Sequence, residues 1–452
     1  MRYEYGVADK SDTRETLAMI PQWIIEKKRD GKALEKEEIR AFINGYAADE
    51  IPDYQMSALA MAIYLQGMTY EETAVLTNVM MNSGNLVDTS SVTRPKADKH
   101  STGGIGDKVS LILAPLVACC GIGVPMISGR GLGITGGTLD KMESIAGYRT
   151  DLSEQEFVKV VRDCGCSIIG QTAELAPADK KLYALRDVTA TVPSIPLITA
   201  SIMCKKMAEG IDVLVLDVKY GSGAFMKTLD DARKLAWSMV NTGSAMGKKV
   251  VAVLTGMDEP LGCEVGNALE VKESIECLGG NGAEDLMEVT LALSAQMLLL
   301  TNIAKDEESA LSMLKEKIES GAALEKFKEM VGLHGGDISM IDDPSKLPEA
   351  EIANPLLSPA EGTVVAVDAG AVGRAALLLG AGRVKTSDKV DHAVGISSLA
   401  KIGMRVSKGD TLAIIHARDT VKMEEAGKMI AKAFKITHTA SAPSPRIKEI
   451  VR

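Results

Sequence analysis

The sequence predicts an α/β protein built from a small all-helical domain, a large mainly parallel α/β domain and a C-terminal α+β module with a barrel-like texture. Helical periodicity fills the first part of the chain, short apolar strands alternate with amphipathic helices in the middle, and β-rich patterns follow residue 352. The 452 residues, 46% hydrophobic and 25% charged, suit a folded globular chain of about three domains.

The N-terminal region has a helical pattern after a polar start. Residues 1–18 lack periodicity, and we expect them to form an extension outside the fold. Residues 19–85 are the expected helical domain, and a lysine-rich helical stretch at 178–208 is expected to pack back onto it. The polar, extended segment 87–99 is a candidate hinge. Helices are expected at 35–47, 53–66 and 69–83.

The expected α/β domain comprises residues 95–177 and 209–340. Alternating strands and helices favour a parallel sheet covered by helices. The uncharged stretch 109–129 reaches membrane-spanning length, but Pro115 and several glycines interrupt it. We therefore interpret it as a buried helix followed by a buried strand. Strands are expected at 124–127, 167–169, 213–218 and 250–254.

A polar segment at 335–354 is expected to link this body to the C-terminal α+β domain, residues 352–452. There, 362–367 alternates, and 406–416 resembles the glycine turns of lipoyl and biotinyl carrier barrels. A carrier domain needs an exposed lysine at a hairpin tip, and Lys422 is the nearest candidate. Because Lys422 lies in a run of helical character, a structural role is favoured.

Charge and composition exclude several classes of partner. Asp and Glu outnumber Lys and Arg by 61 to 51, so the net charge of -10 is the wrong sign for binding nucleic acid polymers or anionic membranes. Aromatic residues, at 4%, are too few for base-stacking platforms. Seven cysteines without paired CxxC spacing fit a reducing compartment, and the charged N-terminus lacks the apolar core of a signal peptide. We expect a cytoplasmic protein.

Glycine indicates where the chemistry lies. Of 42 glycines, 11 fall between residues 103 and 147. Two glycine-rich loops, 99–110 and 128–141, each lead into a helix and would present free N–H groups to an anion, although neither has P-loop or dinucleotide-binding spacing. The alternative is that their hydroxyl groups only cap helices and turns. The candidate anion donors are Lys99, Ser101, Ser110, Ser128 and Thr138.

A third polar cluster begins at Arg186 and ends near Lys205. If the chain is helical from residue 198 onward, Ser201 and Lys205 share one helix face at i and i+4. A hydroxyl beside an ammonium can bind the polar edge of a planar heterocycle. A solvated helix face is the alternative.

Long motifs make the chain similar to the thymidine and pyrimidine-nucleoside phosphorylases. The motifs are KHSTGG at 99–104, SGRGLGITGGTLDKMES at 128–144, GNALEVKE at 266–273 and the stretch APADKKLYALRDVTATVPSIPLITASIMCKK at 176–206. The resemblance extends from about residue 19 to the end of the chain. It implies a homodimer joined through the helical domains, and a pentosyltransferase that cleaves pyrimidine nucleosides with inorganic phosphate to free base and α-(deoxy)ribose 1-phosphate.

The resemblance also implies roles for individual residues. Catalysis would fall to His100, Arg186 and Lys205, which would stabilise the departing base, and closure about the hinge would bring the nucleoside and phosphate sites together. No covalent intermediate and no cofactor are required. Lys99, Ser101, Ser110, Ser128 and Thr138 match phosphate-binding positions, and Arg186, Ser201, Lys205, Met126 and Leu132 match substrate-binding positions.

This chain departs from the family pattern at three positions. Ile134 replaces a histidine, so any polar contact of that histidine is lost. Met126 replaces a lysine that some members associate with the sugar 2'-hydroxyl, which predicts that thymidine and deoxyuridine outperform uridine. Lys108 replaces a threonine at a potassium site found in some relatives: its ammonium could take the place of the ion, and a bound structural potassium ion is the alternative. The residues matching that site are Gly106, Leu261, Glu264 and Glu273.

Two other functions remain open on the sequence. Anthranilate phosphoribosyltransferase has this architecture, but it needs carboxylates for magnesium and pyrophosphate, whereas this chain offers Arg186 and Lys205 for a base. A non-catalytic nucleotide-binding or carrier protein would use the barrel-like C-terminal module instead. Phosphate-dependent release of base separates both from a phosphorylase.

Overall fold

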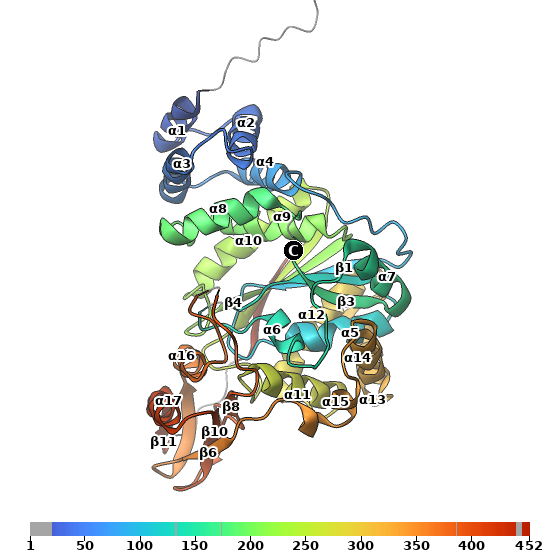
Figure 1. The fold of residues 1–452 in the computed structure, drawn as a ribbon, viewed down its shortest axis with the longest axis vertical. Helices are drawn as coiled ribbons and strands as arrows, with labels where there is room; N and C mark the ends of the chain where they lie inside the picture. Colours follow the sequence, from blue (N-terminus) through green and yellow to red (C-terminus); the bar gives the residue numbers. More distant parts are fainter. Residues whose placement is uncertain (1–19, 132, 173, 386, 440–444) are drawn as a thin grey trace, which may run out of the picture.

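A helical domain, an α/β domain and a C-terminal α+β domain follow one another along the long axis of the molecule (Figure 1). The computed structural model describes residues 20–131, 133–172, 174–385, 387–439 and 445–452. The three-part α/β fold predicted from the sequence is confirmed. The expected extension at residues 1–18 lies outside the described residues.

The helical domain combines two separate stretches of sequence. Its buried apolar core joins side chains of the first stretch, such as Phe42 and Met56, to Leu182 and Leu197 of the second. Local signals begin the helices: the capping box at Thr69 starts the fourth, where the backbone N–H groups of the N-cap and of the third helical residue are both satisfied. The helices are α1 (Pro21–Arg29), α2 (Lys36–Ala47), α3 (Asp53–Gln66), α4 (Tyr70–Met81), α8 (Pro177–Val188) and α9 (Ile195–Ala208).

A parallel sheet forms the centre of the α/β domain. Strands β1 (Ala97–Ser101), β4 (Val213–Tyr220) and β5 (Lys249–Gly256) pair in that order. The parallel pair β2 (Val124–Ser128) and β3 (Cys166–Gly170) lies beside β1, linked by a bridge between residues 96 and 123. The flanking helices are α5 (Val109–Cys119), α6 (Thr138–Met142), α7 (Glu154–Cys164), α10 (Leu229–Ala245), α11 (Asn267–Leu278), α12 (Glu284–Leu300), α13 (Glu307–Glu319), α14 (Ala322–Leu333) and α15 (Ser339–Asp342).

The uncharged stretch 109–129 forms buried helix α5 followed by buried strand β2, as the sequence predicts. Residues 109–118 of α5 are all buried, so the helix is apolar on every side because sheet and helices surround it. Among the described residues, no helix has the length and apolarity needed to cross a membrane. The segment expected to be a linker, 335–354, carries α15 and the 3-10 turn Pro344–Lys346, with Ile341 and Leu347 buried.

A buried histidine ties the end of α14 to β3. The ring of His334 stacks on Tyr148 with centroids 4.4 Å apart. Its Nε2 shares a 2.8 Å hydrogen bond with Ser167 Oγ, and its Nδ1 lies 2.8 Å from the carbonyl oxygen of Arg149. Burial lowers the pKa of His334 to about 4, so the ring is neutral near pH 7.

The C-terminal domain consists of two three-stranded antiparallel sheets covered by two helices. Its strands do not close into a barrel within the described residues, so the barrel-like texture expected from the sequence corresponds to open sheets. Lys422 lies in the first turn of a helix rather than at a hairpin tip, which disfavours the carrier interpretation. The elements are β6 (Ile352–Leu357), β7 (Gly362–Val367), α16 (Ala369–Leu379), β8 (Gly395–Ser397), β9 (Arg405–Val406), β10 (Thr411–Ala417), α17 (Thr420–Ala433) and β11 (Phe434–Thr437).

The chain then returns to the central sheet. Strand β12 (Ile447–Val451) pairs antiparallel with β5, so the C-terminal end lies in the middle of the molecule (Figure 1). The sequence predicts a C-terminal domain of residues 352–452. In the structure β12 instead belongs to the sheet of the α/β domain, a pairing that no local pattern in the sequence indicates.

Candidate active site

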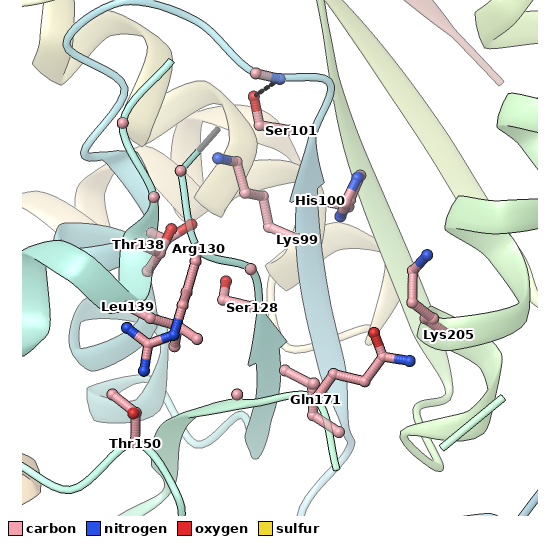
Figure 2. Close-up of a pocket in the computed structure, with 18 of the residues that line it drawn as sticks. Lys99, His100, Ser101, Ser128, Arg130, Thr138, Leu139, Thr150, Gln171 and Lys205 are labelled. Carbon is pink, nitrogen blue, oxygen red and sulfur yellow. Dashed lines mark hydrogen bonds between the residues drawn. The ribbon is translucent and has the colours of Figure 1, made fainter. Parts of the chain in front are cut away.

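A cavity of about 830 Å³ opens at the carboxyl ends of β1, β2 and β3, where open α/β sheets bind ligands. Its volume lies within the usual range for small-molecule sites. The two glycine-rich loops line one side of the cavity, and α9 of the helical domain lines the other (Figure 2). The cavity therefore lies between the helical and α/β domains.

Strand β1 presents consecutive side chains to opposite sides of this cavity, as alternation along a strand requires. Lys99 points toward the second glycine-rich loop, whereas His100 points toward α9 and Lys205 (Figure 2). The ammonium of Lys99 is 3.6 Å from Asp107 Oδ1 and 3.9 Å from Asp217 Oδ2, too far for normal hydrogen bonds. Its charge is thus only loosely paired and can be directed at an anion in the cavity.

The first glycine-rich loop leads from β1 into α5. Gly103 N donates a 3.2 Å hydrogen bond to Ser101 Oγ, which turns the loop back at the end of the strand. A Cβ on Gly104 would lie 2.6 Å from Cδ of Lys219, so any larger residue would have to displace that buried lysine side chain. Ser110, in the first turn of α5, lines the cavity. Hydroxyl groups and the free N–H groups of a helix start therefore face one space.

The second glycine-rich loop runs from β2 to α6 and folds tightly on itself. A Cβ on Gly131 would lie 2.7 Å from the backbone nitrogen of Gly137. Gly131 N donates a 2.7 Å hydrogen bond to Asp140 Oδ2, which pins the loop to the start of α6. Ser128 ends β2 and Thr138 begins α6, and both line the cavity. Leu132 lies outside the described residues.

The C-terminal domain holds this second loop from behind. Arg383 donates a 2.7 Å hydrogen bond to Asp140 Oδ1 and accepts one of 2.9 Å from Gly133 N through its carbonyl oxygen. Helix α16 comes so close that a Cβ on Gly373 would contact the side chain of Ile105 in the first loop and lie 3.0 Å from the carbonyl oxygen of Ile134 in the second. Ile134 packs against the core of the C-terminal domain. Both loops thus rest on α16.

A buried network of lysines and carboxylates lies under the first loop. Lys219 Nζ is 2.8 Å from Asp217 Oδ2, and Lys141 donates a 2.5 Å hydrogen bond to the carbonyl oxygen of Asp107. Burial alone would raise the pKa of Asp107, but the ammonium groups of Lys219 and Lys99 hold that pKa well below its usual range. The Asp107 carboxylate is therefore ionised and helps to position Lys99.

On the other side of the cavity, Lys205 of α9 forms an ion pair with Asp179 of α8. Lys205 Nζ donates hydrogen bonds of 2.5 Å to Asp179 Oδ2 and 3.0 Å to Ser201 Oγ. Burial would lower the pKa of Lys205, but Asp179 outweighs it and raises that pKa, which keeps the ammonium protonated. Burial and the charges of Lys206 and Lys205 hold the pKa of His100 well below its usual value. The cavity therefore offers a cationic lysine beside a neutral imidazole.

The cavity brings together some of the residues proposed from the sequence and leaves others outside. Arg186 is 1% exposed and donates hydrogen bonds to the carbonyl oxygens of Thr191, Val192 and Leu197. It holds the α8–α9 connection instead of lining the cavity. Ser201 accepts from Lys205 behind the cavity wall, and Met126 is buried in the α/β core. Lys99, His100, Ser101, Ser110, Ser128, Thr138 and Lys205 line the cavity.

The residues matching the potassium site surround the side chain of Lys108. Its ammonium donates to the carbonyl oxygens of Leu261 and Glu264 and to Oε2 of Glu273. Gly106 begins the same turn, with φ of 71°. Among the described residues, no cluster of three or more His, Cys, Asp or Glu side chains is suited to hold a metal ion.

Sequence reasoning missed several residues of the cavity wall. Asp107 and Arg130 stand inside the two glycine-rich loops, and Thr150 and Gln171 lie at the edge where β3 ends. The expected strand at 167–169 could have pointed to Gln171, because side chains just after parallel strands gather at one edge of a sheet. Thr150 carries no comparable signal in the sequence.

Family models match most of the chain. The model described as "Glycosyl transferase family, helical bundle domain" matches residues 22–84, and "Glycosyl transferase family, a/b domain" matches 93–324. The model described as "Pyrimidine nucleoside phosphorylase C-terminal domain" matches 363–437. Among solved structures, an anthranilate phosphoribosyltransferase from Thermus thermophilus superposes with a TM-score of 0.57 at 17% identity, covering 69% of this chain and 99% of that one, which shows a shared fold alone.

Curated relatives are much closer. The pyrimidine-nucleoside phosphorylase of Staphylococcus haemolyticus (strain JCSC1435) is 50% identical over 421 residues, covering 93% of this chain and 97% of the relative. Those of Bacillus subtilis (strain 168) and Geobacillus stearothermophilus are 50% and 51% identical, covering 94% and 87% of this chain and 97% and 91% of the relatives. With a family-specific C-terminal domain and this identity over nearly its whole length, the chain belongs to the pyrimidine-nucleoside phosphorylase family.

Proposed function

We propose that the protein catalyses the reversible phosphorolysis of pyrimidine nucleosides to free base and α-(deoxy)ribose 1-phosphate. One observation carries the proposal: a single cavity has the two glycine-rich loops and Lys99 on one side and Lys205 and His100 on the other. A displacement in which phosphate attacks one face of a sugar while a base leaves from the other needs this arrangement. The names of the relatives that share half of its residues agree with the proposal.

The chemistry follows from where charge develops. A phosphate oxygen bonds to the anomeric carbon as the glycosidic C–N bond breaks and its electron pair passes to the base. The configuration at the anomeric carbon inverts, and the proton carried by hydrogen phosphate balances the one that the base takes up. The transition state places positive charge on the sugar and negative charge on the base, so donors aimed at the base carbonyls accelerate the step. Lys205 and neutral His100 provide such donors.

Arg186 is proposed as a third base-binding donor, and in this structure it needs a rearrangement to act. Its guanidinium is engaged with three backbone carbonyl oxygens of the α8–α9 connection. Movement of the helical domain toward the glycine-rich loops, with the candidate hinge at residues 87–99, would have to exchange one of these partners for a pyrimidine carbonyl. Arg186 and Ser201 therefore belong to the closed state of the proposed cycle.

We propose that thymidine and deoxyuridine are better substrates than uridine. Met126 is fully buried and has no group that could hydrogen-bond a sugar 2'-hydroxyl. It therefore provides no interaction that would favour ribose over deoxyribose. A substrate panel at fixed phosphate checks this preference. A kcat/KM for uridine equal to or above that for thymidine would refute it.

The assembly that we propose is a homodimer joined through the helical domains. Large apolar side chains of this domain are exposed, including Trp23 at 62%, Tyr54 at 74% and Leu65 at 71%. A group of exposed large apolar side chains on one domain is what a subunit interface would cover. Light scattering should give twice the chain mass, and Leu65→Glu should shift the measured mass toward that of the monomer.

We also propose a cytoplasmic location. The seven cysteines are free thiols, which supports this proposal.

The decisive assay measures release of thymine from thymidine. We expect release to require added phosphate and to be indifferent to magnesium, with deoxyribose 1-phosphate formed in equal amount. Lys205→Ala should lower kcat/KM by about 100-fold or more, as loss of a charged donor in a closed site does. Lys181→Ala is the matched control, because Lys181 pairs with the exposed side chain of Asp49 on the outer surface of the same domain. Release without phosphate, or only with magnesium and pyrophosphate, would contradict the proposal.

A further inference from the structure

The ammonium of Lys108 is enclosed in a cage of oxygen atoms. Lys108 is fully buried, and its three N–H donors are directed at the carbonyl oxygen of Leu261 at 3.0 Å, that of Glu264 at 2.9 Å and Oε2 of Glu273 at 2.5 Å. An ammonium has three donors, and each has one partner here. The cage comes from a loop and a helix far from Lys108 in the sequence.

These oxygens are the kind that bind a dehydrated monovalent cation. Carbonyl oxygens replace the hydration shell of potassium in proteins, and one carboxylate balances its charge. Ammonium and potassium have the same charge and similar size. The Lys108 nitrogen stands within hydrogen-bond distance of all three cage oxygens, so a potassium ion has no room among them. The residues present therefore do not fit the ion that some relatives hold.

We propose that Lys108 is a built-in cation that replaces a monovalent metal ion, so that this protein folds and keeps its anion-binding loops without potassium. The inference rests on the fold and not on the proposed reaction. A tethered ammonium cannot dissociate, so the charge is always present.

The cage is held in place by contacts that do not involve Lys108. Glu273 also accepts hydrogen bonds from the backbone nitrogens of Cys263 at 2.7 Å and Glu264 at 3.2 Å. On the outer side of the same loop, Lys401 of the C-terminal domain donates to the carbonyl oxygens of Pro260 at 2.5 Å and Gly262 at 2.9 Å. Shortening residue 108 would therefore leave an oxygen cage that a free cation can enter.

The position of the cage connects it to the cavity. Lys108 immediately precedes α5, and Ser110 in the first turn of that helix lines the cavity. The turn before it is tight: Gly106 lies at φ of 71°, and a Cβ there would contact the carbonyl oxygen of Leu261. Loss of the cation would leave the carbonyl oxygens of Leu261 and Glu264 without the ammonium donor and the buried Glu273 carboxylate without a compensating positive charge. We expect the first glycine-rich loop to loosen as a result.

The test compares potassium chloride with choline chloride at equal ionic strength. For the wild-type protein, the thermal midpoint and the KM for phosphate should be the same in both salts. Lys108→Thr should melt roughly 5 °C or more below the wild type in choline, and potassium should raise its midpoint by at least about 3 °C. Lys108→Met is the matched control, because its side chain fills the space without a charge. It should be destabilised in both salts alike.

Three outcomes would contradict a built-in cation at Lys108. A wild-type midpoint that rises in potassium relative to choline, or a potassium ion retained by the wild-type protein after dialysis and found by elemental analysis, would overturn the proposal. Equal midpoints of Lys108→Thr in the two salts would overturn it as well. If Lys108→Thr does not fold in either salt, the wild-type comparison alone decides. The thermal midpoint is measured without enzymatic turnover, so the comparison of the two salts can be interpreted even if the proposed reaction is not observed.

Discussion

Replacing Asp179 by asparagine should change the pH dependence of the protein rather than simply abolish its activity. The carboxylate lies 2.5 Å from the ammonium of Lys205 and is itself buried, with 3% of its side chain exposed. It opposes the burial that would lower the pKa of Lys205. The Asp179→Asn substitution keeps the shape of the side chain and removes that charge, so burial would then determine the pKa of the lysine.

The size of the effect follows from the geometry. A fully buried lysine without a partner loses up to roughly 3–5 pKa units. The side chain of Lys205 is 24% exposed to the cavity, so only part of that loss is expected. Each pKa unit lost corresponds to about 1.4 kcal/mol in favour of the neutral amine. Without the charge of Asp179, burial lowers the pKa of Lys205, so the ammonium is present at low pH and lost as the pH rises through the lowered pKa.

The assay is kcat/KM for thymidine phosphorolysis between pH 6 and 9.5 at saturating phosphate. We expect the ratio of variant to wild type to be nearly constant at the acidic end of this range and to fall, by up to about tenfold per pH unit, toward its alkaline end. Asp49→Asn is the control, since it removes the carboxylate of an exposed ion pair with Lys181 in the same domain. A variant profile parallel to that of the wild type would refute the reasoning, and so would a uniform loss at every pH.

Three further expectations concern stability and loop support. Because His334 is neutral in the folded protein, with a pKa of about 4, the unfolded chain alone binds a proton as the pH falls from 6.5 toward 4. Stability in urea should therefore decline over that window by up to about 3 kcal/mol, and His334→Gln should remove that part of the decline. Gly373→Ala should wedge α16 away from both glycine-rich loops and raise the KM for phosphate several-fold, whereas Gly427→Ala, whose Cβ would meet its nearest neighbour at 3.3 Å, should not. Arg186→Ala should lower the thermal midpoint by roughly 5 °C as well as the turnover, because it leaves buried carbonyl oxygens without donors, and an unchanged midpoint would contradict this.

Much of the fold could be predicted because its elements carry strong local signals. Strands expected at 124–127 and 213–218 appear as β2 and β4, each extended by one or two residues at its end. The prolines and glycines that interrupt the uncharged stretch 109–129 favour a buried helix followed by a buried strand, which the structure confirms as α5 and β2. Local patterns did not show which sheet an isolated strand joins. The placement of β12 beside β5 and the open sheets around β7 and β10 depend on contacts made far along the chain.

The candidate site could also be predicted only in part. The glycine-rich loops could be located because glycine, serine and lysine in that order suit backbone close to an anion, and the structure places Lys99 and Ser128 on one cavity. The orientation of Arg186 could not be predicted, because a guanidinium can satisfy backbone carbonyl groups as well as a ligand. The roles of Asp107 and Asp179 could not be predicted either. Each carboxylate acts on the charge of a nearby lysine, and the sequence does not show which lysines the fold brings close to it.

The pairing of β12 with β5 has a consequence for how the protein reaches its native state. The two strands are separated in the sequence by the whole C-terminal domain, so that domain is in effect an insertion within the central sheet. Until residues 447–451 arrive, the outer edge of β5 exposes unpaired backbone groups next to an apolar sheet, and such edges recruit other chains. Pairing of elements this distant in sequence is also slow. The step most exposed to misassembly is therefore the docking of these few residues.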